Sequence, residues 1–379
     1  MINKFEIVVP TLLGIEAITA REIRSLGYET TNVSDGRVTF KGDFSAVARA
    51  NTWIRSGDRV LIKVGEFKAV TFDELFEKSK NLPWAEWLPK DAKFPIKGFS
   101  FKSALFSVSD CQSIIKKSIV SSMTKSYSMT WFPETGDLYQ LQFSIMRDIV
   151  TIMIDTTGQG LHKRGYRPQS NEAPIKETLA ASMISLSFWR PDKQLADPFC
   201  GSGTFPIEAA LIARNIAPGL HRRFAAEKIS AIPKKVWLDA REEGNSVIKK
   251  DIRLDITASD IDENAVNLTK LNSKYAGVDR DIRVLKRPLS EFVSEAERGT
   301  LICNPPYGER LGEIKEAEEL YRELGEIYRG LNNWALFSIT SNEGFENLFG
   351  RKADKKRKLY NGMIKCYFYQ YFSQKPSPK

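Results

Sequence analysis

The order of apolar and polar residues changes character twice along the chain, which divides it into three parts. The first part, residues 1–65, alternates short apolar runs with segments whose apolar residues recur at helical spacing. Strands are expected at residues 5–9, 37–40 and 60–64, and helices at residues 14–26 and 44–54. This pattern predicts a small α/β unit.

The second part, residues 66–160, combines helical segments with two strands of strictly alternating character. A helical stretch is expected at residues 71–88, a second helix at 110–127, and strands at 138–148 and 149–155. Alternation of apolar and polar residues predicts a sheet with one covered face, so this part is an α+β module. Its second helix carries Lys116, Lys117 and Lys125, which either contact phosphate or form a solvated face.

The third part, residues 161–379, alternates apolar strands with helices, which predicts a mostly parallel sheet with crossover helices. An amphipathic helix is expected at residues 175–187, and strands at 195–200, 255–260, 282–286, 300–304, 334–340 and 363–372. The last strand follows a basic loop, residues 351–358, with six Lys or Arg in eight residues. This loop either touches RNA phosphates or is a solvated surface loop.

The composition favours an acidic partner and argues against a metal site. The 379 residues carry a net charge of +9, and a basic protein gains affinity for nucleic acid by releasing phosphate counterions, although many basic enzymes have other partners. The four cysteines lie far apart and only two histidines are present, so no zinc-binding spacing exists and no metal is expected. The lack of a signal peptide or of an apolar span predicts no membrane contact and a cytoplasmic location.

The most specific motif is DPFCGSGT, residues 197–204, which lies between an apolar strand and an apolar helix. Glycines allow a tight turn and a close ligand, and the helix start offers unpaired N–H groups. A dinucleotide site would need a third glycine where Pro206 stands. The motif therefore predicts a pocket for a methyl donor, formed by Asp197, Phe199, Cys200, Gly201, Ser202, Gly203 and Thr204.

Two acidic residues have candidate roles in this pocket. Asp260 ends the next strand and is expected to hydrogen-bond the ribose hydroxyls of an adenosine, with Ile261 beside it; the alternative role for Asp260 is a helix N-cap. Asp262 is expected to support the start of that helix. Asp197 either holds the loop or contacts the amino group of a bound methionine moiety.

The second motif, Asn304-Pro305-Pro306-Tyr307, also follows an apolar strand and should face the same crevice, because ligands bind at the carboxyl ends of parallel strands. An aryl amine is a poor nucleophile. The side-chain oxygen of Asn304 and the main-chain oxygen of Pro305 can accept its hydrogen bonds and orient it, while Pro305 and Pro306 stiffen the loop. Tyr307 offers a face for a base removed from its stack. The alternative is a rigid turn.

These motifs resemble those of THUMP-domain class I S-adenosylmethionine-dependent RNA methyltransferases, and more narrowly the bacterial 23S rRNA guanine-N2-methyltransferase family. The matching segments are GLHKRGYR (160–167), APIKETLAASM (173–183), DPFCGSGTFPIEAALIARNIAPGLHRRF (197–224) and NPPYGERL (304–311). The resemblance implies a Rossmann-like methyltransferase domain with a mostly parallel seven-stranded sheet (161–379), preceded by a ferredoxin-like module (1–65) and a THUMP RNA-binding module (66–160). It also implies S-adenosyl-L-methionine as cofactor and structured RNA, 23S rRNA or a ribosomal assembly intermediate, as partner.

Some roles and substrates stay open at this point. His162, Lys163, Arg164 and Arg167 lie at a module junction, where they either grip RNA or form a structural linker. Relatives carry an acid near the adenine after the third strand, and Ser290 or Glu291 are the candidates here. Besides guanine N2 in 23S rRNA, the alternatives are guanine N2 in tRNA, adenine N6 in DNA, and a non-catalytic RNA-binding assembly factor with a vestigial pocket.

Overall fold

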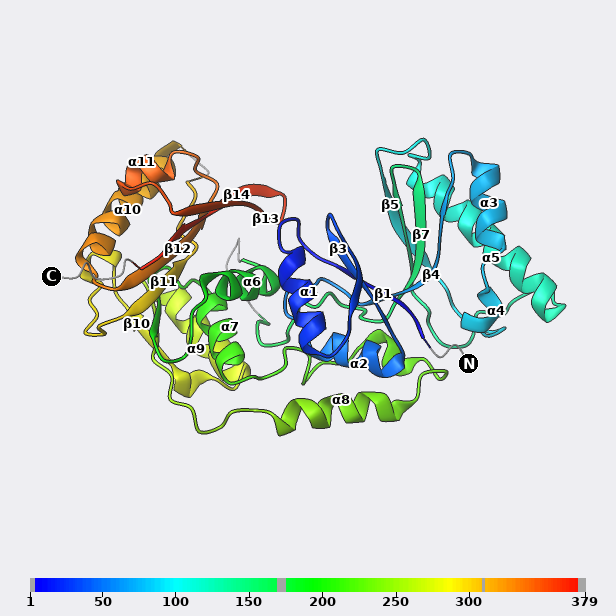
Figure 1. Cartoon of the computed structure of the whole chain (residues 1–379), viewed down its shortest axis with the longest axis horizontal. Coiled ribbons are helices and arrows are strands. Elements are labelled where there is room, and N and C mark those ends of the chain that lie inside the picture. The colour runs from blue at the N-terminus through cyan, green and yellow to red at the C-terminus, as the bar shows by residue number, and fades with distance from the viewer. Residues whose placement is uncertain (1–3, 169–174, 309–310, 374–379) are drawn as a thin grey trace.

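Two seven-stranded sheets organise the protein (Figure 1), whose computed structural model describes residues 4–168, 175–308 and 311–373. In the N-terminal sheet the strands lie in the order β2 (Thr30–Ser34), β3 (Arg37–Gly42), β1 (Phe5–Pro10), β4 (Leu61–Lys68), β7 (Ile149–Asp155), β6 (Leu141–Met146) and β5 (Ile96–Phe101). All neighbours are antiparallel except β5 and β6. The boundary expected after residue 65 lies within β4.

Five helices pack against this sheet: α1 (Glu16–Ser25), α2 (Phe44–Trp53), α3 (Phe72–Lys80), α4 (Trp84–Trp87) and α5 (Val108–Tyr127). The buried residues of α5, Cys111, Ile115, Ile119 and Met123, recur every four positions and form one stripe. The helical stretch expected at residues 71–88 forms two separate helices. Pro83 lacks an N–H and disfavours a helical conformation in the residue before it, so α3 ends at Lys80 and α4 is a separate turn.

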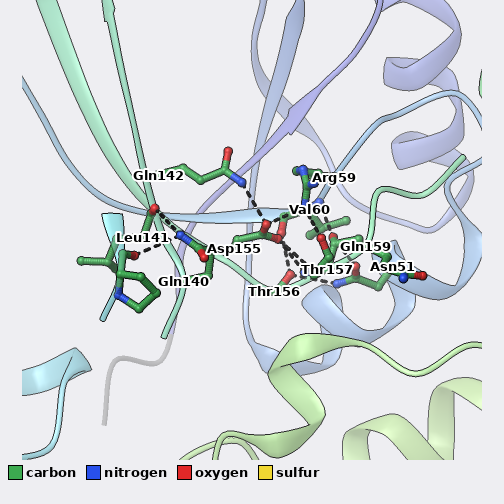
Figure 2. Close-up of polar contacts among 12 residues, drawn as sticks. Asn51, Arg59, Val60, Gln140, Leu141, Gln142, Asp155, Thr156, Thr157 and Gln159 are labelled. Atoms are coloured by element: carbon green, nitrogen blue, oxygen red, sulfur yellow. Dashed lines mark hydrogen bonds and ion pairs between the residues drawn. The ribbon is translucent and has the colours of Figure 1, made fainter. Parts of the chain in front are cut away.

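The junction of these helices and strands is a buried polar network (Figure 2). Asn51 of α2 donates from Nδ2 to Thr156 Oγ1 at 2.9 Å, and its Oδ1 accepts from Thr157 Oγ1 at 2.6 Å. Arg59 donates to Asp155 Oδ2 at 2.6 Å. Because buried polar groups are stable only with partners, this network fixes α2 relative to the ends of β4 and β7.

The C-terminal sheet has the predicted, mostly parallel seven-stranded form. Its order is β10 (Ile282–Lys286), β9 (Ile256–Asp260), β8 (Gln194–Asp197), β11 (Gly299–Cys303), β12 (Trp334–Thr340), β14 (Ile364–Tyr371) and β13 (Lys355–Asn361). Only β14 is antiparallel to its neighbours. The basic segment expected to be a loop over residues 351–358 is a loop only as far as Asp354. From Lys355 it is strand β13, which pairs with β14 and directs Leu359 into the core.

Helices cover both faces of this sheet (Figure 1). One core contains α6 (Glu177–Ser187) and α7 (Thr204–Ala213), and the other contains α10 (Leu311–Gly330) and α11 (Phe345–Phe349). The prediction that α6 is amphipathic is wrong: it is buried on nearly every side, because Ile15 and Ile18 from the N-terminal part join the same core.

The remaining helices follow α7 in the C-terminal half of the chain. They are α8 (Lys234–Ser246), α9 (Glu263–Tyr275) and the 3-10 helices η1 (Ala225–Lys228), η2 (Asp279–Asp281) and η3 (Leu289–Glu291). Helix α8, which the sequence did not reveal, lies along α2, and its Glu243 is 2.7 Å from Arg49. Among the described helices none has the length and apolar character that a membrane crossing requires.

Candidate active site

A cavity of about 870 Å³ lies at the carboxyl ends of β8, β9 and β11, and both sequence motifs line it. Parallel strands end at the same edge of a sheet, so loops distant in sequence meet there. The predicted residues on its wall are Asp197, Phe199, Cys200, Gly201, Ser202, Thr204, Asp260, Ile261, Asn304, Pro305, Pro306 and Tyr307. The structure therefore brings the glycine loop and the Asn304 loop to one site.

Gly203 is not on the cavity wall, and the structure gives it a different purpose from the one expected. Its φ of +84° is a left-handed conformation, and a Cβ there would lie 2.9 Å from the side chain of Thr269. Thr269 of α9 also donates to the main-chain oxygen of Gly201 at 2.8 Å. Gly203 therefore permits close packing of the loop on α9, whereas Gly201 faces the cavity.

Asp260 ties the glycine loop to the end of β9. Its Oδ2 accepts from the Gly201 N–H and its Oδ1 from the Asp262 N–H, both at 3.0 Å. The residue that caps α9 is Asp262, which accepts from the Asn264 N–H at 2.9 Å. The helix-cap alternative for Asp260 is thus wrong, while the expected support by Asp262 is confirmed.

Asp197 is a carboxyl group in an apolar setting at the floor of the cavity. It is 1 % exposed, and its Oδ1 accepts from the Phe199 N–H at 3.1 Å, so it does hold the loop. Burial raises its pKa well above the ordinary value, and the nearby charge of Asp260 adds to this. A positive group bound in the cavity would favour the ionised carboxylate, so the site is electrostatically suited to a cation.

The Asn304 loop is braced from two sides. Asn304 Oδ1 accepts a hydrogen bond from the Tyr307 hydroxyl at 2.7 Å. Behind the loop, the hydroxyl of Tyr321 on α10 donates to the main-chain oxygen of Pro306 at 2.6 Å and lies 2.9 Å from Thr340 Oγ1. Burial raises the pKa of Tyr307, so its hydroxyl stays protonated and orients the Asn304 oxygen. Tyr321 was missed because it lies in another element.

Several wall residues have no motif that could have revealed them: Ile175, Pro288, Leu289, Leu320, Glu323, Asn361 and Ile364. In the segment after β10 the cavity is lined by Pro288 and Leu289, whereas the expected Ser290 and Glu291 are exposed and do not line it. Glu323 of α10 is different from the rest of this apolar wall. Within the described residues it has neither a hydrogen bond nor an ion pair, and burial raises its pKa.

Two of the residues expected to grip RNA are buried ion-pair partners instead. Arg164 Nε lies 3.4 Å from Glu208 Oε1, and both side chains are almost fully buried. Arg167 lies 3.0 Å from Glu177 and donates to Thr204 Oγ1 at 2.9 Å. The RNA-binding prediction is therefore wrong for these two arginines, and the structural-linker alternative holds, because their charges are already neutralised inside the protein.

The other basic candidates divide into neutralised and exposed groups. Burial and nearby cations lower the pKa of His162 to about 4, so it is uncharged near neutral pH and adds no attraction for phosphate. Lys116 is paired with Glu134 and lies 3.7 Å from the ring centroid of Phe94. The side chains that remain exposed are Lys117, Lys125, Lys163, Lys352, Lys355 and Lys358. Within the described residues, no group of three or more His, Cys, Asp or Glu is arranged to hold a metal ion.

Three family models match successive segments of the chain, and known proteins are similar to nearly all of it. Residues 164–370 match the RMKL-like methyltransferase domain, residues 6–61 the RlmL ferredoxin-like domain and residues 69–155 the THUMP domain. YpsC of Bacillus subtilis, named as a candidate RNA methyltransferase, is 47% identical over 374 residues, which cover 98% of this chain and 97% of YpsC.

A second relative is much longer than this chain. Ribosomal RNA large subunit methyltransferase K/L of Psychromonas ingrahamii is 31% identical over 372 residues, which cover 96% of this chain but 49% of the relative. The chain thus spans about half of that protein's length.

Two solved structures have the same fold throughout. A Listeria monocytogenes protein described as a predicted N6-adenine-specific DNA methylase is 48% identical with a TM-score of 0.93, covering 98% of this chain and 97% of the other. A candidate methyltransferase solved in complex with S-adenosylhomocysteine is 42% identical with a TM-score of 0.93, and 100% of both chains is covered. These likenesses confirm the expected fold class.

Proposed function

Because this chain belongs to the family of RMKL-like methyltransferases, we propose that it transfers a methyl group from S-adenosylmethionine to the N2 amino group of a guanine in 23S rRNA. The resemblance drawn from the motifs is confirmed, and S-adenosylmethionine is the cofactor of this fold. The observation that carries the proposal is a single cavity lined by both motifs. The glycine loop contributes the buried carboxyl group of Asp197, and the second loop contributes the Asn304 side-chain oxygen, which accepts a hydrogen bond from Tyr307.

The cavity wall fits this cofactor from one end to the other. The buried carboxylate of Asp197 suits the ammonium group of the methionine moiety, and Asp260 at the end of β9 suits the ribose hydroxyls. Ile261 is 69 % exposed beside it and, with Pro288 and Leu289, offers an apolar surface for the adenine ring. Glu323, on the helix that packs on η3, would accept a hydrogen bond from the adenine amine.

The residues of the chain perform positioning rather than acid–base chemistry. When bound, the sulfonium cofactor would supply an activated methyl group and leave as S-adenosylhomocysteine, and the methylated amine would lose its extra proton to water after the transfer. Asn304 Oδ1 and the main-chain oxygen of Pro305 accept hydrogen bonds from the target amine and direct its lone pair, while Tyr307 holds the Asn304 side chain. Tyr321 holds the loop through Pro306, so little conformational freedom is lost when a base enters.

The N-terminal modules support an RNA substrate. The THUMP match, the net charge of +9 and the names of YpsC and of the K/L methyltransferase agree with an RNA substrate, and a ribosomal substrate implies a cytoplasmic enzyme. The division into a ferredoxin-like module (1–65), a THUMP module (66–160) and a methyltransferase domain (161–379) is part of this proposal.

Transfer of a radioactive methyl group from the cofactor tests the substrate. Purified protein is incubated separately with 23S rRNA, tRNA and duplex DNA, and the modified nucleoside is identified by mass spectrometry, with Asn304→Ala as the inactive control. We expect N2-methylguanosine in 23S rRNA alone. Exclusive labelling of tRNA would overturn the choice of rRNA, and the absence of heat on titration with S-adenosylhomocysteine would indicate a vestigial pocket.

Methylation of adenine N6 in DNA is the second candidate function. It is favoured by the description of the Listeria relative and by the Asn304 loop, which can accept hydrogen bonds from either aryl amine. The same assay separates the two, because labelled N6-methyladenine in duplex DNA, with no label in RNA, would replace the first proposal.

A further inference from the structure

The outermost strand of the N-terminal sheet, β5, carries a row of exposed phenylalanines. Phe99 is 52 % and Phe101 51 % exposed, and Phe106, in the connection to α5, is 81 % exposed. Large apolar side chains gathered on a surface usually mark a binding site. Phe99, Phe101 and Phe106 are called the aromatic strip below.

The alternation of β5 explains why these rings are outside the core. Gly98 lies on the covered face, where a Cβ would be 2.4 Å from the ring of Phe143, and Phe143 belongs to the core under α5. Residues two apart on a strand share a face, so Phe99 and Phe101 lie on the opposite one. Figure 1 shows α3 and α5 on one side of this sheet, and the methyltransferase domain lies toward the other.

Most of the charged side chains next to the aromatic strip are positive, and one is negative: Asp148, at the turn between β6 and β7, accepts from the Ala104 N–H at 2.8 Å. Lys97 and Lys102 are exposed, and Lys102 Nζ lies 5.4 Å from the ring centroid of Phe101. Arg147, exposed at the turn between β6 and β7, is next to Phe101 because its N–H donates to the Phe101 main-chain oxygen at 3.2 Å. Residues 96–106 contain no acidic residue. Aromatic rings flanked by cations favour nucleic acid over an apolar protein surface.

We propose that Phe99 and Phe101 stack on unpaired bases of the RNA substrate while Lys97 and Lys102 contact the adjoining phosphates. The two rings start about 6.6–6.8 Å apart along the strand, a spacing that lets each of them meet one base of an extended segment. Bases in a duplex are already stacked on each other, so the aromatic strip selects single-stranded RNA. This inference rests on the proposed RNA substrate and adds that the N-terminal sheet binds a single-stranded segment of that RNA.

Binding of two fluorescein-labelled probes to the full chain tests the proposal: a single-stranded oligouridine and an RNA duplex of equal length. The double variant Phe99→Ala/Phe101→Ala should bind the single strand at least 10-fold more weakly, because each stacked base contributes roughly 5- to 100-fold in affinity. Its affinity for the duplex should change less than twofold. The matched control is Phe188→Ala, which removes a ring that is 66 % exposed on the other domain.

Two further measurements keep the outcomes distinct. S-adenosylhomocysteine affinity and the unfolding temperature show whether the double variant is folded. Unchanged single-strand binding by a folded double variant would overturn the proposal, as would a change of oligomeric state with RNA affinity intact, which would assign the strip to a second copy of the chain. The proposed function is tested separately by methyl transfer with the wild-type protein. Binding of the single-stranded RNA probe to the aromatic strip does not require methyl transfer, so either proposal can fail without the other.

Discussion

The two sheets of this protein have the same number of strands but place their functional residues differently. The C-terminal sheet is mostly parallel and covered on both faces, so its functional residues lie in loops beyond the strand ends, and the cavity with both motifs lies at the carboxyl ends. The N-terminal sheet is mostly antiparallel and covered by helices on one face, so its candidate residues lie on the other face of a strand. A parallel sheet thus concentrates function in loops, and a half-covered antiparallel sheet in alternate strand positions.

Buried charge joins the two sheets. Arg164 in the linker pairs with Glu208 of α7 and donates to the main-chain oxygen of Arg55, which follows α2. Glu22 of α1 accepts from the N–H groups of Arg55 and Ser56 at 3.1 Å. A third region therefore lies between the two sheets, and its buried basic residues are structural rather than RNA-binding.

The largest expected effect is on that joint. Arg164→Ala would leave Glu208 buried without its cationic partner and should lower the free energy of unfolding by about 3–5 kcal/mol, measured by urea denaturation. Lys163→Ala, a neighbouring exposed residue, is the control and should change it by less than about 0.5 kcal/mol. If the Arg164→Ala variant were as stable as the wild type but bound RNA more weakly, Arg164 would be an RNA-binding residue and not a structural one.

The next largest effect is expected from the loss of Asn304, whose side-chain oxygen is proposed to orient the target amine at the end of the parallel sheet. Asn304→Ala should lower kcat about 10²- to 10³-fold, because it removes a preorganised oxygen that acts on the reacting amine, while S-adenosylhomocysteine affinity stays within about twofold. Tyr307→Phe removes only the hydroxyl that orients Asn304, so its loss of kcat should be smaller. Normal turnover by Asn304→Ala would show that the loop is a rigid turn and nothing more.

Asp197 makes cofactor binding depend on pH. Its pKa is raised by burial, so the carboxyl becomes protonated as the pH falls through that raised value, and its attraction for the cofactor ammonium is lost. Calorimetry with S-adenosylhomocysteine should therefore show affinity falling toward acid pH. Asp197→Asn should bind roughly 10- to 100-fold more weakly near neutral pH and lose this dependence. An unchanged pH profile in the variant would exclude the charged contact.

The smallest effect concerns the adenine end of the cavity. Glu323→Ala removes the acceptor and should reduce S-adenosylhomocysteine affinity about 3- to 10-fold, the size of one hydrogen bond, with no change for an analogue that lacks the adenine amine. Glu326→Ala, one turn further along α10 and exposed, is the matched control. Equal losses for both ligands would mean that Glu323 shapes the wall without contacting the amine.

The features that could be predicted from the sequence are local ones. Each motif lies directly after an apolar strand, and parallel strands end at a common edge, so the order of the chain was enough to predict that Asp197, Gly201, Asp260 and Asn304 share a site. The same alternation predicted the sheets, because side chains on a strand change faces at every residue.

Which elements cover which surfaces depends on how the helices and strands pack, and this could not be predicted from local patterns. Glu323 lines the cavity from α10, Tyr321 of the same helix braces the Asn304 loop from behind, and α6 is buried in a core that Ile15 and Ile18 also join. The sequence allowed Arg164 to be an RNA-binding residue, but in the structure it forms a buried ion pair with Glu208. Spacing along a chain reports the neighbours within one helix or strand, but burial and ion pairing depend on contacts between distant segments, and these form only when the elements pack.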